Sequence, residues 1–362
     1  MKHVVIYAEA GRFAGWPANN GLWSWGGREI LAGFTLGGFD EQPGHNIREP
    51  YRSILARSRN EGDTWTAVEP ENFVGRAAGV SGSPGGFDFT AFGFAMRVVG
   101  TGYHGSDNPA GAFYASDDRG DTWRGPFSFG SLADHTELLG LEITSRTDYI
   151  VSGPGECLLM MSARGPEVFT DRVFCARTSD GGRSFSFVSW IVGPADPYRA
   201  VMPSTVRCRS RRLVSAIRRR DLTTGRCWID AYGSAEDGSK WVHLASVGDT
   251  GPWNGNPPAL AALTDGRLCC VYGDRQSCRM MAKFSPDEGR TWDGESVLRA
   301  DFRRDRYGDP DLGYPRVVQR ADGRLLAVYY WATAEIPAQH IAATIWDPNG
   351  NQETGTDDFS AT

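Results

Sequence analysis

Ser116-Asp-Asp-Arg-Gly-Asp-Thr-Trp123 is one of five copies of an eight-residue pattern, Ser/Thr-x-Asp-x-Gly-x-x-Trp, that recurs along this chain. The other copies occupy residues 58–65, 178–185, 234–241 and 285–292, the second of these four ending in Phe185 in place of tryptophan. Successive copies begin 58, 62, 56 and 51 positions apart. A period of this size indicates repeated supersecondary units, so the fold is predicted to be an array.

Each recurring position of the pattern has a physical role in a tight turn. The acidic or Asn side chain at the third position can accept backbone N–H bonds and close the turn. Glycine at the fifth position permits a positive φ at little steric cost. The final aromatic ring offers a large apolar face that packs beside the turn. The five copies are therefore predicted to be structural connections between strands and not sites of chemistry.

The pattern resembles the Asp-box, or BNR repeat, of the sialidase (neuraminidase) superfamily of β-propellers, and the resemblance spans nearly the whole chain. It implies an all-β fold of four-stranded antiparallel blades with almost no helix. Short apolar runs around the five turns predict five blades, and residues 316–319, 324–330 and 341–346 predict a sixth. The sixth unit lacks the repeated turn, and residues 4–7 can supply its missing outer strand and close the ring. We expect one propeller domain over residues 1–348 and a polar tail over 349–362.

Composition narrows the classes of protein. The chain has 362 residues, 23% of them charged, and a net charge of −6, so nucleic acid is not an expected partner. Its seven cysteines include no Cys-x-x-Cys pair, which argues against a zinc site and a full disulfide framework. No apolar run approaches the roughly 20 residues of a membrane helix. The first nine residues read as a strand and not as a signal peptide. We expect a cytoplasmic protein from the chain as given, and a secreted or periplasmic one if a signal has been removed.

Strand alternation indicates where the chemistry lies. If the five turns share one face of the ring, the starts of the first strands and the loops between second and third strands lie on the opposite face. Those segments carry many arginines, histidines and aromatic residues. A guanidinium fork suits bidentate capture of a carboxylate. The predicted substrate-binding residues on this face are Arg12, Trp16, Asn19, Asp88, His104, His135, Arg199, Arg218, Arg275, Asp311 and Arg316.

The family resemblance implies roles for some of these residues. Sialidases hold the sugar carboxylate with three arginines, for which Arg12, Arg199 and Arg275 are the candidates here. A loop aspartate acts as general acid/base, and a tyrosine activated by a glutamate is the nucleophile. Asp40, Tyr314 and Glu137 match these roles by position. The opening Arg-Ile-Pro of the family pattern is replaced by Arg12-Phe-Ala.

Three functions remain open at this point. The first is a sialidase-like exo-glycosidase that hydrolyses a terminal carboxylated sugar from an acidic oligosaccharide or glycoconjugate. The second is a lyase that cleaves rhamnosyl-glucuronate linkages by β-elimination, with His45 as its acid or base. The third is a glycan-binding propeller without catalysis. No cofactor or metal is expected, because the histidines lack a compact ligand spacing.

Overall fold

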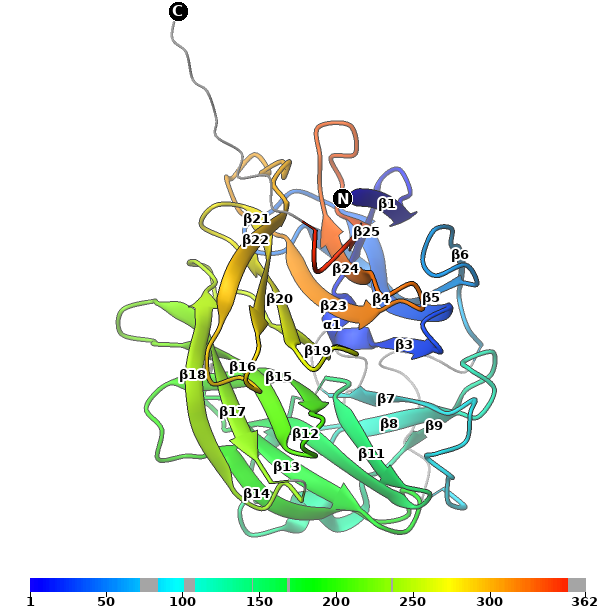
Figure 1. The fold of residues 1–362 in the computed structure, drawn as a ribbon, viewed down its shortest axis with the longest axis vertical. Helices are drawn as coiled ribbons and strands as arrows, with labels where there is room; N and C mark the ends of the chain where they lie inside the picture. Colours follow the sequence, from blue (N-terminus) through cyan, green and yellow to red (C-terminus); the bar gives the residue numbers. More distant parts are fainter. Residues whose placement is uncertain (72–83, 101–107, 145, 168–169, 236, 351–362) are drawn as a thin grey trace, which may run out of the picture.

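The computed structural model describes residues 1–71, 84–100, 108–144, 146–167, 170–235 and 237–350, whose strands form six sheets (Figure 1). The sheets stand as blades around a common centre. The helices among these residues are α1 (Pro17–Asn20) and the 3-10 helix η1 (Gly130–Asp134). The predicted all-β, six-bladed β-propeller is confirmed. No helix in this part of the chain has the length and apolar character needed to cross a membrane.

The first three blades follow one another along the chain. Blade 1 contains β2 (Arg12–Gly15), β3 (Leu22–Trp25), β4 (Glu29–Phe39), β5 (Ile47–Ser58) and β6 (Thr66–Val68). Blade 2 contains, among the residues the structure describes, β7 (Ala95–Val99), β8 (Ala112–Ser116) and β9 (Arg124–Phe127). Blade 3 contains β10 (Glu142–Ile143), β11 (Tyr149–Gly153), β12 (Glu156–Arg164), β13 (Arg172–Thr178) and β14 (Ser186–Val192).

The remaining blades have four strands each. Blade 4 contains β15 (Arg199–Arg207), β16 (Leu213–Arg220), β17 (Cys227–Ser234) and β18 (Trp241–Asp249). Blade 5 contains β19 (Ala259–Ala262), β20 (Leu268–Asp274), β21 (Arg279–Ser285) and β22 (Asp293–Arg299). Blade 6 contains β23 (Gly313–Gln319), β24 (Leu325–Trp331), β25 (His340–Trp346) and β1 (Lys2–Tyr7). Figure 1 shows β3, β11, β15, β19 and β23 near the centre and β14 and β18 at the rim.

The N-terminal strand closes the ring as the sequence predicts. Strand β1 pairs antiparallel with β25, with Lys2 opposite Ile345 and Tyr7 opposite Ile341. The first residues of the chain thereby complete the last blade. This pairing removes an open strand edge from blade 6.

The five repeated turns connect the last two strands of blades 1 to 5. In the turn of blade 2, Ser116 Oγ accepts the N–H of Gly120 at 2.8 Å, and Asp118 Oδ1 accepts that of Thr122 at 2.9 Å. The indole of Trp123 donates to Gly120 O at 3.2 Å, and the φ of Gly120 is +80°. The predicted roles of the acidic side chain and of the glycine are confirmed in this turn.

Four of these turns bring their glycine close to the preceding blade, and a Cβ on Gly238 of blade 4 would lie 2.9 Å from Cys175 of blade 3. A Cβ added to Gly120 would overlap the side chain of Leu31 on blade 1. A Cβ on Gly62 would overlap Leu326 of blade 6, and one on Gly289 would lie 3.1 Å from Val214 of blade 4. Apolar clusters then fill the space between adjacent sheets. The turns therefore hold neighbouring blades together, and the opposite face is left to loops of other kinds.

We expect Gly120→Ala to destabilise the ring more than Gly140→Ala. Both glycines have positive φ, but a Cβ on Gly140 would meet nothing within 4 Å. Forcing alanine into the left-handed region costs about 1–2 kcal/mol at either position. Overlap with Leu31 adds about 1–3 kcal/mol at Gly120 alone. Urea unfolding of both variants measures the difference, and equal losses of stability would contradict the inter-blade contact.

Candidate functional site

Tyr314 lies at the start of β23, on the face opposite the repeated turns. Its φ is +49°, a left-handed conformation that is unusual for a bulky residue. The buried side chain of Asn256 fixes this segment, because its Oδ1 accepts the Tyr314 N–H at 2.8 Å and its Nδ2 donates to Leu312 O at 2.8 Å. Tyr314 is 8% exposed. Its phenol is therefore held in one place within a largely buried environment.

Cationic side chains surround the Tyr314 phenol. Arg218 Nη1 donates to Tyr314 Oη at 3.3 Å, and its guanidinium lies 5.7 Å from the ring centroid. Burial alone would raise the pKa of Tyr314, but the charges of Arg218, His45 and Arg275 lower it to about 7. Tyr314 is therefore poised between phenol and phenolate near neutral pH. A group in that state can act as a nucleophile or as a base.

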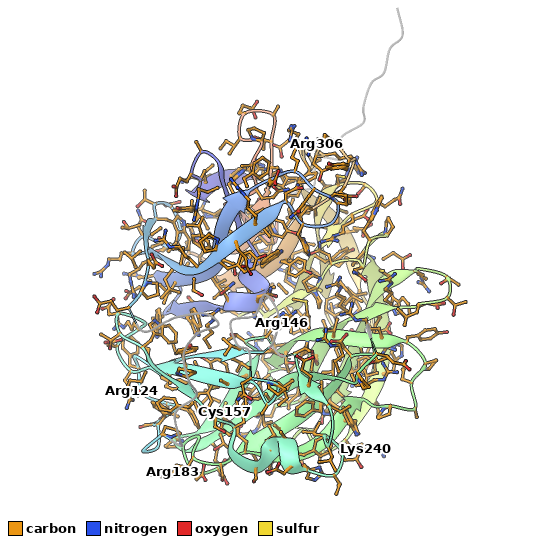
Figure 2. All side chains as sticks on the ribbon, turned by 180° about the vertical axis from the view of Figure 1, so that it is seen from behind. Arg124, Arg146, Cys157, Arg183, Lys240 and Arg306 are labelled. Carbon is orange, nitrogen blue, oxygen red and sulfur yellow. The ribbon has the colours of Figure 1, made fainter. Side chains whose placement is uncertain are left out.

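Two further arginines extend the cationic cluster. Arg146 Nε donates to Asn19 Oδ1 at 2.6 Å, and Figure 2 shows Arg146 near the middle of the ring. Burial, assisted by the nearby charges of Arg218 and Arg199, lowers the pKa of Arg146 to about 9. Arg199 forms an ion pair with the buried Asp171, with 2.7 Å between Nε and Oδ2.

The cluster can accept an anion. Arg146, Arg218 and Arg275 lie near Tyr314, and Arg199 lies near Arg146 and Arg218. We define these four residues of blades 3, 4 and 5 as the arginine cluster. Arg275 Nη1 donates to Trp253 O at 2.6 Å, and its guanidinium also lies beside Tyr330, but its buried Nε and Nη2 make no hydrogen bond of normal geometry to the described residues. A ligand acceptor within hydrogen-bond distance of Arg275 would satisfy these two donors.

A second polar group stands beside the tyrosine. His45 Nδ1 lies 2.7 Å from Asp311 Oδ1, and Tyr330 donates to the same oxygen at 2.6 Å. Burial alone would lower the pKa of His45, but the Asp311 carboxylate raises it above its usual value. Burial likewise opposes ionisation of Asp311, yet His45 and Tyr330 hold its pKa below its usual range. This pair favours a charged imidazolium that can donate a proton.

A pocket of about 560 Å³ opens next to these groups, lined in part by His45, Arg220, Trp253, Asn254, Arg275 and Asp311. Several residues around this pocket have unusual backbone conformations. Positive φ values occur at Trp16, Met202, Trp253, Asn254 and Tyr314. Such conformations persist where the surrounding structure enforces them, and they often mark functional sites.

Several predicted site residues join this arrangement. Trp16 packs edge-on against His45, with ring centroids 5.0 Å apart. Asn19 binds Arg146, as described above. Strand alternation separates the consecutive arginines of β16. Arg220 donates to Asn254 Oδ1 beside Arg218, while Arg219 points the other way and donates to Asp196 at 2.5 Å.

Other predicted residues lie elsewhere. Glu137 accepts a bond from Trp190 at 2.6 Å, and His135 stacks on Phe187 at 4.8 Å. Both partners belong to β14, the outer strand of blade 3. The expectation that Glu137 activates Tyr314 is therefore wrong, and so is the placement of His135 in the central pocket. The loop after β9 contains η1, which contacts the outer strand β14.

The predicted placement of Asp88 and Arg12 in the site is also wrong. Asp88 caps its own turn through Thr90, and the adjacent Phe87 N–H donates to Gly181 O within a repeated turn, so Asp88 lies on the opposite face. Arg12 precedes Phe13, whose ring packs on Trp16 and Tyr330. Because successive side chains of a strand alternate, Arg12 points away from the cluster.

The last three predicted residues are placed as follows. Arg316 Nη2 donates to the backbone oxygens of Ala18, at 2.6 Å, and Thr147. It lines a second cavity of about 330 Å³ on the axis, with Asp148 and Thr205. Asp40 is exposed in the loop between β4 and β5, which also carries His45. His104 lies outside the described residues.

Arg146 is a functional candidate that sequence reasoning missed. Arg146 stands just before the inner strand β11, close to the position that Arg199 and Tyr314 hold at the starts of their own strands. Position relative to the first strand of each blade was therefore the available signal. The described residues include no group of three or more His, Cys, Asp or Glu side chains that could hold a metal ion.

No protein-family model and no curated protein matches the sequence. The chain is similar in structure to a protein of unknown function from Dyadobacter fermentans, with a TM-score of 0.70 and 19% identity over 95% of this chain and 97% of that one. It is also similar to the α-L-arabinanase of Penicillium chrysogenum complexed with arabinobiose, with a TM-score of 0.59 and 11% identity over 96% and 98% of the two chains. The NanB sialidase of Streptococcus pneumoniae gives a TM-score of 0.55 and 11% identity over 96% of this chain and 70% of that one. Such identities establish a shared fold.

We expect Tyr314 to ionise close to neutral pH. The fraction of phenolate should rise with pH through about 7, because the cationic neighbours lower the pKa. Ultraviolet difference titration of the protein against Tyr314→Phe should show this tyrosinate absorbance, and Arg218→Met should move its midpoint upward. Tyr307→Phe, which removes an exposed tyrosine, should leave the signal intact. Absence of any tyrosinate below about pH 9 would contradict the site electrostatics.

Proposed function

We propose that the chain is a carbohydrate-active enzyme that cleaves the glycosidic bond of a terminal carboxylated sugar in an acidic oligosaccharide or glycoconjugate. The observation that carries the proposal is the Tyr314 phenol, with a pKa lowered to about 7 beneath the arginine cluster. A cluster of cations around a reactive phenol suits a substrate that brings its own negative charge. We also propose that the repeated turns are the Asp-boxes of a sialidase-like propeller.

Recognition of the sugar would rest on the arginine cluster. The buried Nε and Nη2 of Arg275 can donate in parallel to the two oxygens of one carboxylate. Arg218 and Arg146 add positive charge near Tyr314. A carboxylate bound here would orient the sugar ring above the phenol. Fixing two reacting groups in this way lowers the entropic part of the barrier.

Hydrolysis would proceed in two steps. The Tyr314 phenolate attacks the anomeric carbon, and the leaving oxygen takes a proton from Asp40, the acid of the β4–β5 loop. Water then attacks the glycosyl-tyrosine, with the Asp40 carboxylate accepting its proton, and the phenolate is regenerated. Known proteins of similar fold include a sialidase and an arabinanase, which supports a carbohydrate substrate.

Elimination is the second candidate, and one observation favours it. Arg218 is the partner of the Tyr314 hydroxyl, and the imidazolium of His45 stands nearby, with rings 6.4 Å apart. The phenolate would remove the proton on the carbon next to the sugar carboxylate, while His45 protonates the leaving oxygen. The arginine cluster would stabilise the negative charge that develops on the carboxylate. The product is an unsaturated uronic acid.

Product analysis on a panel of acidic oligosaccharides distinguishes the candidates. A free saturated sugar indicates hydrolysis, and a product with new ultraviolet absorbance indicates elimination. Binding of the panel without turnover indicates the third candidate, a glycan-binding propeller. A panel that is neither bound nor cleaved would contradict the proposal.

On a cleaved substrate, we expect Tyr314→Phe to lower kcat by about 10²–10⁴-fold, because either reaction uses its ionised oxygen. His45 also lowers the pKa of Tyr314, so His45→Ala should cause a comparable loss that higher pH does not restore only if the reaction is elimination. Asp40→Asn should do so only if it is hydrolysis. Tyr307→Phe is the matched control and should keep full activity. Wild-type turnover by Tyr314→Phe would contradict the assigned role.

A further inference from the structure

The pocket carries an exposed aromatic ring that the proposed chemistry does not use. Trp253 lies in the loop between β18 and β19 and lines the pocket together with His45 and Arg275. Its side chain is 48% exposed. The guanidinium of Arg304 lies 6.0 Å from the ring centroid. A large apolar surface is thus presented to solvent beside the arginine cluster.

The backbone of this loop is held by the same arginines that flank Tyr314. Trp253 and Asn254 have φ values of +54° and +71°. Arg275 Nη1 donates to Trp253 O at 2.6 Å, and Arg218 Nε donates to Asn254 O at 2.7 Å. These bonds hold the backbone that carries the indole close to the guanidinium groups, with both residues in left-handed conformations. Such strain in a surface loop is consistent with a positioned functional side chain.

We propose that Trp253 forms a second sugar subsite, on which the ring next to the carboxylated sugar stacks. The apolar C–H face of a sugar ring packs well on the electron-rich face of an indole. The pocket volume of about 560 Å³ falls within the range of pockets that bind drug-sized ligands. Such ligands are larger than one monosaccharide. The substrate is then an oligosaccharide of at least two rings. This inference rests on the proposed function, because it assumes that the arginine cluster binds the first ring.

Calorimetric titration of paired ligands tests the subsite. The monosaccharides are D-glucuronic acid, D-galacturonic acid and N-acetylneuraminic acid, and their partners are glucuronosyl-xylose, trigalacturonic acid and 3′-sialyllactose. The full chain carries Tyr314→Phe in every titration, so that the oligosaccharides stay intact. Stacking should make at least one oligosaccharide bind about tenfold more tightly than its monosaccharide.

Trp253→Ala should abolish this advantage and leave the affinity for the monosaccharide within about twofold. Trp253→Phe should retain most of the advantage, since it keeps an aromatic face. Phe92→Ala is the control, because Phe92 is 69% exposed next to a repeated turn on the opposite face. It should change neither affinity.

The outcomes separate this inference from the proposed function. Equal weakening of both ligands by Trp253→Ala would show that the residue only supports the loop, and would overturn the subsite. A monosaccharide that binds as tightly as its oligosaccharide would do the same while the proposed function stands. If no acid binds but neutral arabinotriose binds and depends on Trp253, the subsite stands and the carboxylate specificity falls. If none of these ligands binds, both fall.

Discussion

The contact between a repeated turn and the blade before it is the constraint on which the rest of this structure depends. A glycine with positive φ brings the turn backbone so close to the neighbouring blade that a Cβ would overlap Leu31 or Leu326. Blade 6 has no such turn, and it is completed instead by pairing of β1 with β25. Blades fixed in this way bring residues more than 250 positions apart in sequence, such as His45 and Asp311, within hydrogen-bond distance.

At the centre of the ring, two cations form ion pairs with acidic side chains, and three arginines lie near the Tyr314 phenol. Asp171 pairs with Arg199, and Asp311 pairs with His45. Arg146, Arg218 and Arg275 lie near the Tyr314 phenol, whose ionisation partly offsets their charge, and Arg275 also lies near Tyr330 and Asp311. A buried cationic cluster that lowers the pKa of a phenol is also a site for a substrate anion. Binding and reactivity therefore depend on the same guanidinium groups.

The sequence predicted the fold better than the site, for a physical reason. Local turn chemistry repeats, so five copies of one pattern defined the blades. The positions of loop residues depend on packing between distant segments. Glu137 lies in the β9–β10 loop and contacts the outer strand β14, and Asp88 lies beside a turn on the opposite face. No local sequence pattern indicated the position of either residue. Arg146 was overlooked because it stands alone just before a strand.

The most direct test of this account measures proton uptake when an acidic sugar binds. If the carboxylate and the Tyr314 phenolate share the arginine cluster, binding must raise the pKa of Tyr314. Above its free pKa of about 7, the complex should then take up a proton. Calorimetry at about pH 8, in buffers of different ionisation enthalpy, should show this uptake in the native protein and its loss in Tyr314→Phe. Tight binding of the acid with no proton uptake, or with the same uptake in Tyr314→Phe, would contradict the account.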